Sequence, residues 1–178
     1  WRMPFLIRPS YADICNMNRN LYIVLVSVVV LLTGITACTH GDKPQNLKES
    51  SPSSRESHNF GQNCLGCHQD AGSEAAEEGR WTVAGSVSND GSSSQPTNAG
   101  GSIELWTSSD RQGTMIYSIP IDQKGNFYTN KTLAISDGVY PVIVNGSSGQ
   151  WDSMSSVCTS GGCNGCHGNT EEFIELPD

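Results

Sequence analysis

Val83-Ala84-Gly85-Ser86-Val87 lies near the start of a block of the chain, residues 81–144, in which apolar side chains alternate with polar or small ones. The same period of two returns in three later runs: Ile103, Leu105 and Thr107; Met115, Tyr117 and Ile119; Tyr140, Val142 and Val144. Runs of this kind, separated by clusters of Gly, Asn, Asp and Ser, are typical of short antiparallel strands. The block therefore predicts a mainly β fold, a small antiparallel β-sandwich.

Four short motifs within this block occur in the order found in a known sandwich. They are Gly85-Ser86-Val87, Ile103-Glu104-Leu105-Trp106, Gly125-Asn126-Phe127 and Gly138-Val139-Tyr140-Pro141-Val142. Together they resemble the carboxypeptidase regulatory-like domain, a transthyretin-like sandwich common in exported bacterial proteins. The resemblance implies a scaffold or binding module without catalytic residues of its own. Because Pro141 has no backbone N–H, we expect the last predicted strand to lie at a sheet edge.

Two copies of the motif C-x-x-C-H flank the block. They are Cys64-Leu65-Gly66-Cys67-His68 and Cys163-Asn164-Gly165-Cys166-His167. On a helical turn, positions i, i+3 and i+4 lie on one face, so two thiols and an imidazole can address one flat porphyrin. This is the attachment pattern of c-type haem, with two thioether bonds and a histidine ligand to iron. Both motifs resemble those of multihaem c-type cytochromes, which implies two covalently bound haem c groups.

Other uses of a C-x-x-C pair are thioredoxin-like redox sites and zinc sites. No strand-helix-strand pattern surrounds either pair. The 95 residues between Cys67 and Cys163 are too many for a compact zinc knuckle, although not for a discontinuous four-cysteine site. The histidines favour haem, because each of the two pairs is followed at once by one of only four His.

A second axial ligand makes a haem iron six-coordinate and suits it to electron transfer. His58, six residues before the first motif, is the leading candidate, either for its own haem or for the other one. His40, Met115 and Met154 compete for the remaining position. Cys158 has no assigned role and could be a free thiol, a link to another copy or an alternative haem thiol.

The N-terminal region predicts export. From Met17 to Ala37, a basic start is followed by an almost wholly apolar run, as in a secretory signal. The ending Ile35-Thr36-Ala37-Cys38 is similar to a bacterial lipobox, which implies that Cys38 becomes an acylated N-terminus. The alternatives are an uncleaved anchor or an unmodified Cys38. Residues 1–16 lie upstream of this signal and look like an over-extended reading frame.

The chain is therefore expected to have five segments. Residues 1–37 are an upstream extension and signal peptide, and residues 38–57 are a lipid-anchored, disordered tether with too few apolar side chains to fold. The sandwich is expected over residues 81–150. Two haem-binding segments of loop and short helix flank it, residues 58–80 and 151–178.

Charge and composition narrow the function. The formal charge is −8 and becomes −10 once residues 1–37 are removed, which argues against nucleic acid as a partner. We predict an exported dihaem c-type cytochrome that transfers single electrons and is not an enzyme. It would be a periplasmic or outer-membrane lipoprotein, or lie at the cell surface. The expected partners are other c-type cytochromes or redox proteins with a basic face, another copy of the chain, and the membrane.

Three rival interpretations stay open at this point. The chain could be a subunit of a polymeric cytochrome filament in which copies exchange distal ligands. It could be a haem-based redox sensor whose sandwich binds a ligand. It could also be a haem enzyme with one open axial position, although no acid–base group accompanies either motif.

Overall fold

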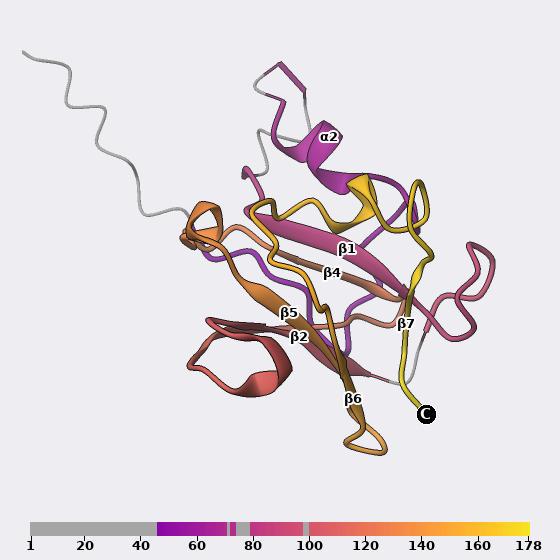
Figure 1. Ribbon diagram of the computed structural model, residues 1–178. Helices are drawn as coiled ribbons and strands as arrows, with labels where there is room; N and C mark the ends of the chain where they lie inside the picture. The colour runs from indigo at the N-terminus through magenta and orange to yellow at the C-terminus, as the bar shows by residue number, and fades with distance from the viewer. Residues whose placement is uncertain (1–45, 71, 74–78, 98–99) are drawn as a thin grey trace, which may run out of the picture. The chain divides into compact units, whose positions relative to one another are not determined.

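The computed structural model describes residues 46–70, 72–73, 79–97 and 100–178. Within these residues the fold is mainly β, with seven strands in two sheets (Figure 1). The strands are β1 (Val83–Ser88), β2 (Gly101–Trp106), β3 (Met115–Pro120), β4 (Asn126–Thr129), β5 (Tyr140–Asn145), β6 (Trp151–Ser153) and β7 (Ile174–Glu175). They are accompanied by helix α2 (Cys64–His68) and the 3-10 turns η1 (Ser109–Arg111), η2 (Ile135–Asp137) and η3 (Cys163–Gly165).

The two sheets share one apolar core. One sheet has the strand order β4-β1-β7 and the other β3-β2-β5-β6. Ile103 on β2 pairs with Ile119 on β3 and with Ile143 on β5, and all three side chains belong to the core. The buried members of this core are Val83, Val87, Ile103, Leu105, Ile119, Ile121, Phe127, Ile135, Val139, Ile143 and Leu176. The predicted small β-sandwich is thus confirmed.

The four alternating runs of the sequence correspond to β1, β2, β3 and β5. Strands β4, β6 and β7 have four residues or fewer, so they show too little of a period of two to be recognised. Strand β7 also departs from the expected antiparallel arrangement, because it runs parallel to β1 with Ile174 opposite Val87. Residues 151–178 therefore do more than flank the sandwich, since β6 and β7 each extend a sheet.

Pro141 does not lie on an edge strand, so that expectation is wrong. Strand β5 lies between β2 and β6. The Pro141 carbonyl accepts a hydrogen bond from Met154 N at 3.0 Å, one residue beyond the end of β6. The N and O of one strand residue face the same side. Pro141 therefore cannot return a second bond to Met154, as an N–H at this position would, and β6 ends at Ser153.

The tether predicted over residues 38–57 is wrong for its second half. Ser50 is 2% exposed, and its backbone N donates to the Tyr128 carbonyl at 3.0 Å. Glu49 bridges Thr129, so this segment covers the free edge of β4. Backbone hydrogen bonds to a sheet edge do not require large apolar side chains, which explains why the polar composition was misleading.

Several predicted features lie outside the described residues. They are the upstream extension, the signal from Met17 to Ala37, Cys38, His40 and residues 38–45 of the tether. Among the residues that are described, no helix is long and apolar enough to cross a membrane.

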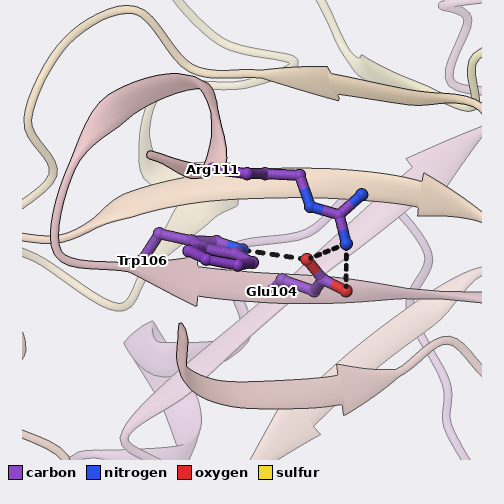
Figure 2. A network of polar contacts seen from close by, with 3 residues as sticks. All are labelled: Glu104, Trp106 and Arg111. Atoms are coloured by element: carbon purple, nitrogen blue, oxygen red, sulfur yellow. Dashed lines mark hydrogen bonds and ion pairs between the residues drawn. The ribbon is translucent and has the colours of Figure 1, made fainter. Parts of the chain in front are cut away.

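A polar and aromatic network lies along β2 and the loop that follows it (Figure 2). Glu104 accepts from Trp106 Nε1 at 2.8 Å and from Arg111 Nη2 at 3.1 Å. The Arg111 guanidinium carbon lies 5.5 Å from the Trp106 ring centroid and 5.6 Å from that of Trp151. Trp151 is thus part of the sandwich surface and does not line the cavity of the second motif described below.

Gly85, in the middle of β1, allows the second motif to pack against this strand. A Cβ atom at position 85 would lie 2.5 Å from Phe127 Cζ and 2.9 Å from Cys163 Cβ. Phe127 is fully buried in the core, so it has little room to move. A side chain at this position would separate the second motif from the sheet.

We expect Gly85→Ala to lower the free energy of unfolding by about 1–3 kcal/mol, the usual cost of overpacking. Denaturant unfolding of the purified protein measures this change. Gly72→Ala is the matched control, because its Cβ would meet only Asp70 Oδ1, at 3.8 Å. Equal midpoints for the two variants would contradict the packing described here.

Candidate functional site

The second C-x-x-C-H motif is attached to β1 on both sides. Before the motif, Ala84 N donates to the Gly161 carbonyl at 2.9 Å, and Ala84 bridges Gly162 in parallel. After the motif, β7 pairs with the other end of β1. Cys163 to Phe173 therefore forms a loop whose two ends are held by the same strand edge.

His167 is oriented by a backbone hydrogen bond. Its Nδ1 lies 2.8 Å from the carbonyl oxygen of Glu172. A carbonyl can only accept, so Nδ1 carries the proton and Nε2 keeps its lone pair. Histidines that bind metals usually donate the other ring N–H in this way. The ring is thus prepared for a metal at Nε2.

The second motif forms one helical turn, as the spacing predicts. His167 N donates to the Cys163 carbonyl at 3.0 Å, a bond between positions i+4 and i. Cys163, Cys166 and His167 all line one cavity of about 520 Å³. This volume lies within the usual range for cofactor pockets.

The same cavity has an apolar lining and two further sulfur atoms. Its apolar lining residues are Ile103, Phe127, Pro141, Ile143, Phe173 and Ile174. Met154 and Cys158 also line it, so two of the residues considered at the sequence level lie with His167. Cys158 Sγ donates to the Ser160 carbonyl at 2.8 Å. Met115, by contrast, is exposed on β3 and lines neither motif's cavity.

The first motif is helix α2 itself. His68 is 4% exposed and Leu65 is 8% exposed, so one side of this turn is buried. Cys64 is half-buried and Cys67 is exposed. These residues share a smaller cavity, of about 60 Å³, with His58 and Trp81.

His58 and His68 lie beside each other. Their ring centroids are 6.0 Å apart, and the ring planes are inclined by 36°. A bond from imidazole nitrogen to metal is about 2.0 Å long, and the ring centroid lies roughly 1.1 Å behind the nitrogen. Two imidazoles on opposite sides of one metal ion are therefore about 6.2 Å apart. The observed separation of 6.0 Å is close to this value.

Two aromatic rings stack behind His68, a feature that sequence reasoning missed. The His68 and Trp81 centroids are 3.5 Å apart with planes inclined by 6°, and Trp81 stacks in turn on Tyr128 at 4.2 Å and 10°. Trp81 lies just before β1, and Tyr128 lies on β4 opposite Ala84. Only this pairing brings the rings together, so the sequence carried no local signal for the stack.

The fold brings the two motifs into contact. A Cβ atom on Gly162 would lie 3.4 Å from Leu65 Cδ1 and 3.5 Å from Asn63 Oδ1. The gold segment of the second motif accordingly lies beside α2 in Figure 1. The rings of Phe60 and Phe173, one next to each motif, stack at 6.0 Å.

At the second motif, two thiols and an imidazole are available to hold a haem, and the cavity beside them is large enough for one. The first motif offers the same kinds of side chain, but its cavity of about 60 Å³ is too small to enclose a porphyrin. A haem there would lie largely towards solvent, on the side of the exposed Cys67. Among the described residues, no three His, Cys, Asp or Glu side chains are grouped to hold a metal ion by themselves, and the five described cysteines form no disulfide with one another.

Comparison with known proteins found no matching family, no matching curated protein and no matching solved structure. The chemistry of this site therefore has to be inferred from its own residues.

Burial changes the acidity of two motif thiols. Desolvation, and to a smaller extent the nearby thiols Cys158 and Cys64, raise the pKa of Cys163 from 9.0 to about 12. Desolvation also raises the pKa of Cys64. Both thiols therefore ionise less readily than an ordinary cysteine, which makes them poor nucleophiles at neutral pH.

In the haem-free protein, we expect Cys163 to react with iodoacetamide much more slowly than the exposed Cys166. At pH 8 only about one Cys163 side chain in ten thousand is a thiolate, because the pKa is about 12. Peptide mapping after timed alkylation measures both rates. The fold favours the protonated thiol, so the free energy of unfolding should fall as the pH rises from about 9 towards 12. Equal alkylation rates at pH 8 would contradict the desolvation of the half-buried Cys163 thiol.

Proposed function

We propose that this chain is an exported dihaem c-type cytochrome that passes single electrons at or outside the cell envelope. The observation that supports this most strongly is the convergence of the two C-x-x-C-H turns beside β1, each with its histidine held in a defined orientation. Structural packing alone does not require two pairs of thiols and two histidines in these places. The raised pKa values of Cys163 and Cys64 also argue against a redox-active thiol pair in either motif.

At the second motif, Cys163 and Cys166 would hold the haem as thioethers, and His167 would bind iron through Nε2. The Glu172 carbonyl keeps the His167 ring in the required tautomer. Met154 lines the same cavity, so its thioether would be a further ligand to the iron. Phe127, Phe173 and other apolar side chains give this cavity an apolar wall against which a porphyrin would pack.

At the first motif, Cys64 and Cys67 would form the thioethers, and His68 and His58 would be the axial ligands. The 6.0 Å separation of the two rings supports this pair. The two rings already lie close together within one copy, which favours ligation within a copy over exchange between copies. His40 is not needed as a ligand in this arrangement.

Haem c supplies a reversible one-electron change at its iron, with a potential set by the axial ligands and by burial. The chain would contribute covalent attachment and the orientation of the histidines. Cys67 and Cys166 are both exposed, so each attachment site opens to solvent, where a redox partner can approach. The acidic chain favours a partner with a basic face, such as another cytochrome or redox protein.

We expect the purified protein to carry two covalent, low-spin haems, and His58→Ala to convert one of them to the high-spin state. Removing the imidazole leaves the iron at the first motif without its second ligand. The pyridine haemochrome assay gives the stoichiometry, and visible and electron paramagnetic resonance spectra give the spin state. Absence of covalent haem would refute the proposed function, whereas an unchanged spectrum would remove only His58 as a ligand.

His40→Ala is the matched control for this experiment, because it removes a histidine that we do not assign to iron. It should leave both haems low-spin. Met154→Ala should convert the haem at the second motif to the high-spin state, and Cys158→Ser should leave it low-spin. If Cys158→Ser changes the spectrum and Met154→Ala does not, the sixth ligand at the second motif is the thiol.

The predicted signal and lipobox, Met17 to Cys38, complete the proposal. The two motifs resemble those of bacterial c-type cytochromes, whose haem is attached outside the cytoplasm. A secretory signal and two attachment motifs in one chain therefore support each other. A lipid on Cys38 would hold the cytochrome at a membrane surface, in the periplasm or at the outer membrane.

We expect Cys38→Ser to abolish lipid attachment, because the thiol is the acylation site. Metabolic labelling with a palmitate analogue and detergent phase separation measure the change. Haem content should be unaffected, since Cys38 is not part of either motif. An unlabelled wild-type protein that partitions into water would contradict the lipoprotein proposal.

A further inference from the structure

We propose that Trp81 is a positioning residue that fixes the plane of the His68 imidazole, with Tyr128 as its support. This inference rests on the proposed function, since it concerns how His68 is presented to iron. It adds a residue outside both C-x-x-C-H motifs, at the start of the sandwich.

The contacts are close on both faces of Trp81. The His68 and Trp81 planes are almost parallel, with an inclination of 6° and a centroid separation of 3.5 Å. Tyr128 stacks on Trp81 at 4.2 Å and 10°. The indole is thus held between the imidazole and the phenol ring, and the His68 ring cannot rotate about its Cβ–Cγ bond without leaving the stack.

Both supporting residues are themselves held by backbone contacts. Gln69 Nε2, next to His68, donates to the Trp81 carbonyl at 3.0 Å. Tyr128 lies on β4 opposite Ala84, and its carbonyl accepts from Ser50 N at 3.0 Å. The two stacked rings therefore fix the position of the imidazole ring relative to the sheet.

The polar end of Trp81 does not explain its position. Trp81 Nε1 is buried and has no hydrogen-bond partner among the described residues. A buried indole usually finds one, because an unsatisfied donor is costly. The flat ring is consequently the part of Trp81 that contributes here, and Phe should be able to replace it.

The plane of His68 matters because of its angle to the second ligand. In low-spin ferric haem, the angle between the two axial imidazole planes controls the anisotropy of the electron paramagnetic resonance signal. The plane of His68, inclined by 36° to that of His58 here, would therefore influence the g-values of a haem held by both rings. Releasing His68 from the stack should spread or shift this signal.

The test uses the haem-loaded full chain and its Trp81→Leu and Trp81→Phe variants. The His58→Ala variant, which should lose the low-spin signal of the first motif, identifies that signal. We expect Trp81→Leu to shift or broaden its g-values and Trp81→Phe to retain them. Trp151→Leu is the matched control, because Trp151 is an exposed Trp that lines neither motif's cavity.

If Trp81→Leu has the same g-values as the wild-type protein, the inference is overturned. The dihaem proposal would not be affected by that result. An equal change in Trp151→Leu would overturn it as well. If Trp81→Leu does not fold, Tyr128→Leu replaces it, since this change removes the support of Trp81 without touching His68. Tyr128→Leu should give a smaller shift in the same direction, and an unchanged spectrum would count against the inference.

Discussion

Strand β1 and its hydrogen-bonding edges organise the structure. One edge pairs with β4, and the other pairs first with Gly161 and Gly162 and then with β7. The second C-x-x-C-H motif is the loop between these two attachments. A short strand in a small sheet would otherwise expose unpaired N–H and C=O groups. Here the same backbone bonds that complete the sheet also hold the second motif in place.

Glycine permits this close approach. Gly85 leaves the space that Phe127 and Cys163 fill, and Gly161 lies directly against the backbone of Thr82. Any larger side chain at these positions would separate the loop from the sheet. The high glycine content of the chain therefore has a local explanation at β1, beyond its general association with turns.

The two motifs have different surroundings, although their sequences are alike. The second opens into an apolar cavity with two sulfur-containing residues, and its histidine bonds a backbone carbonyl. The first has a second histidine beside it and an aromatic stack behind it. Since axial ligands and burial tune the potential of a haem, we infer that the two sites would differ in potential.

The strands that sequence reasoning found were those long enough to show a period of two, such as β2. Strand β7 has two residues and a parallel partner, and it could not be recognised from any local pattern. The segment around Ser50 was misjudged for a related reason. Its stability comes from backbone bonds to β4, which do not depend on side-chain polarity. Pro141 was placed on an edge strand because the early end of β6 is not visible in the sequence.

The sequence by itself determined the mainly β class, and it also predicted the residues that would attach haem, because both depend on spacings within a few residues. A period of two defines a strand, and the positions i, i+3 and i+4 define one face of a turn. The tertiary structure alone decided that the motifs meet, that His58 lies beside His68, and that Trp81 and Tyr128 stack behind it. These contacts join residues far apart in the chain, and they exist only once β1 has paired on both edges.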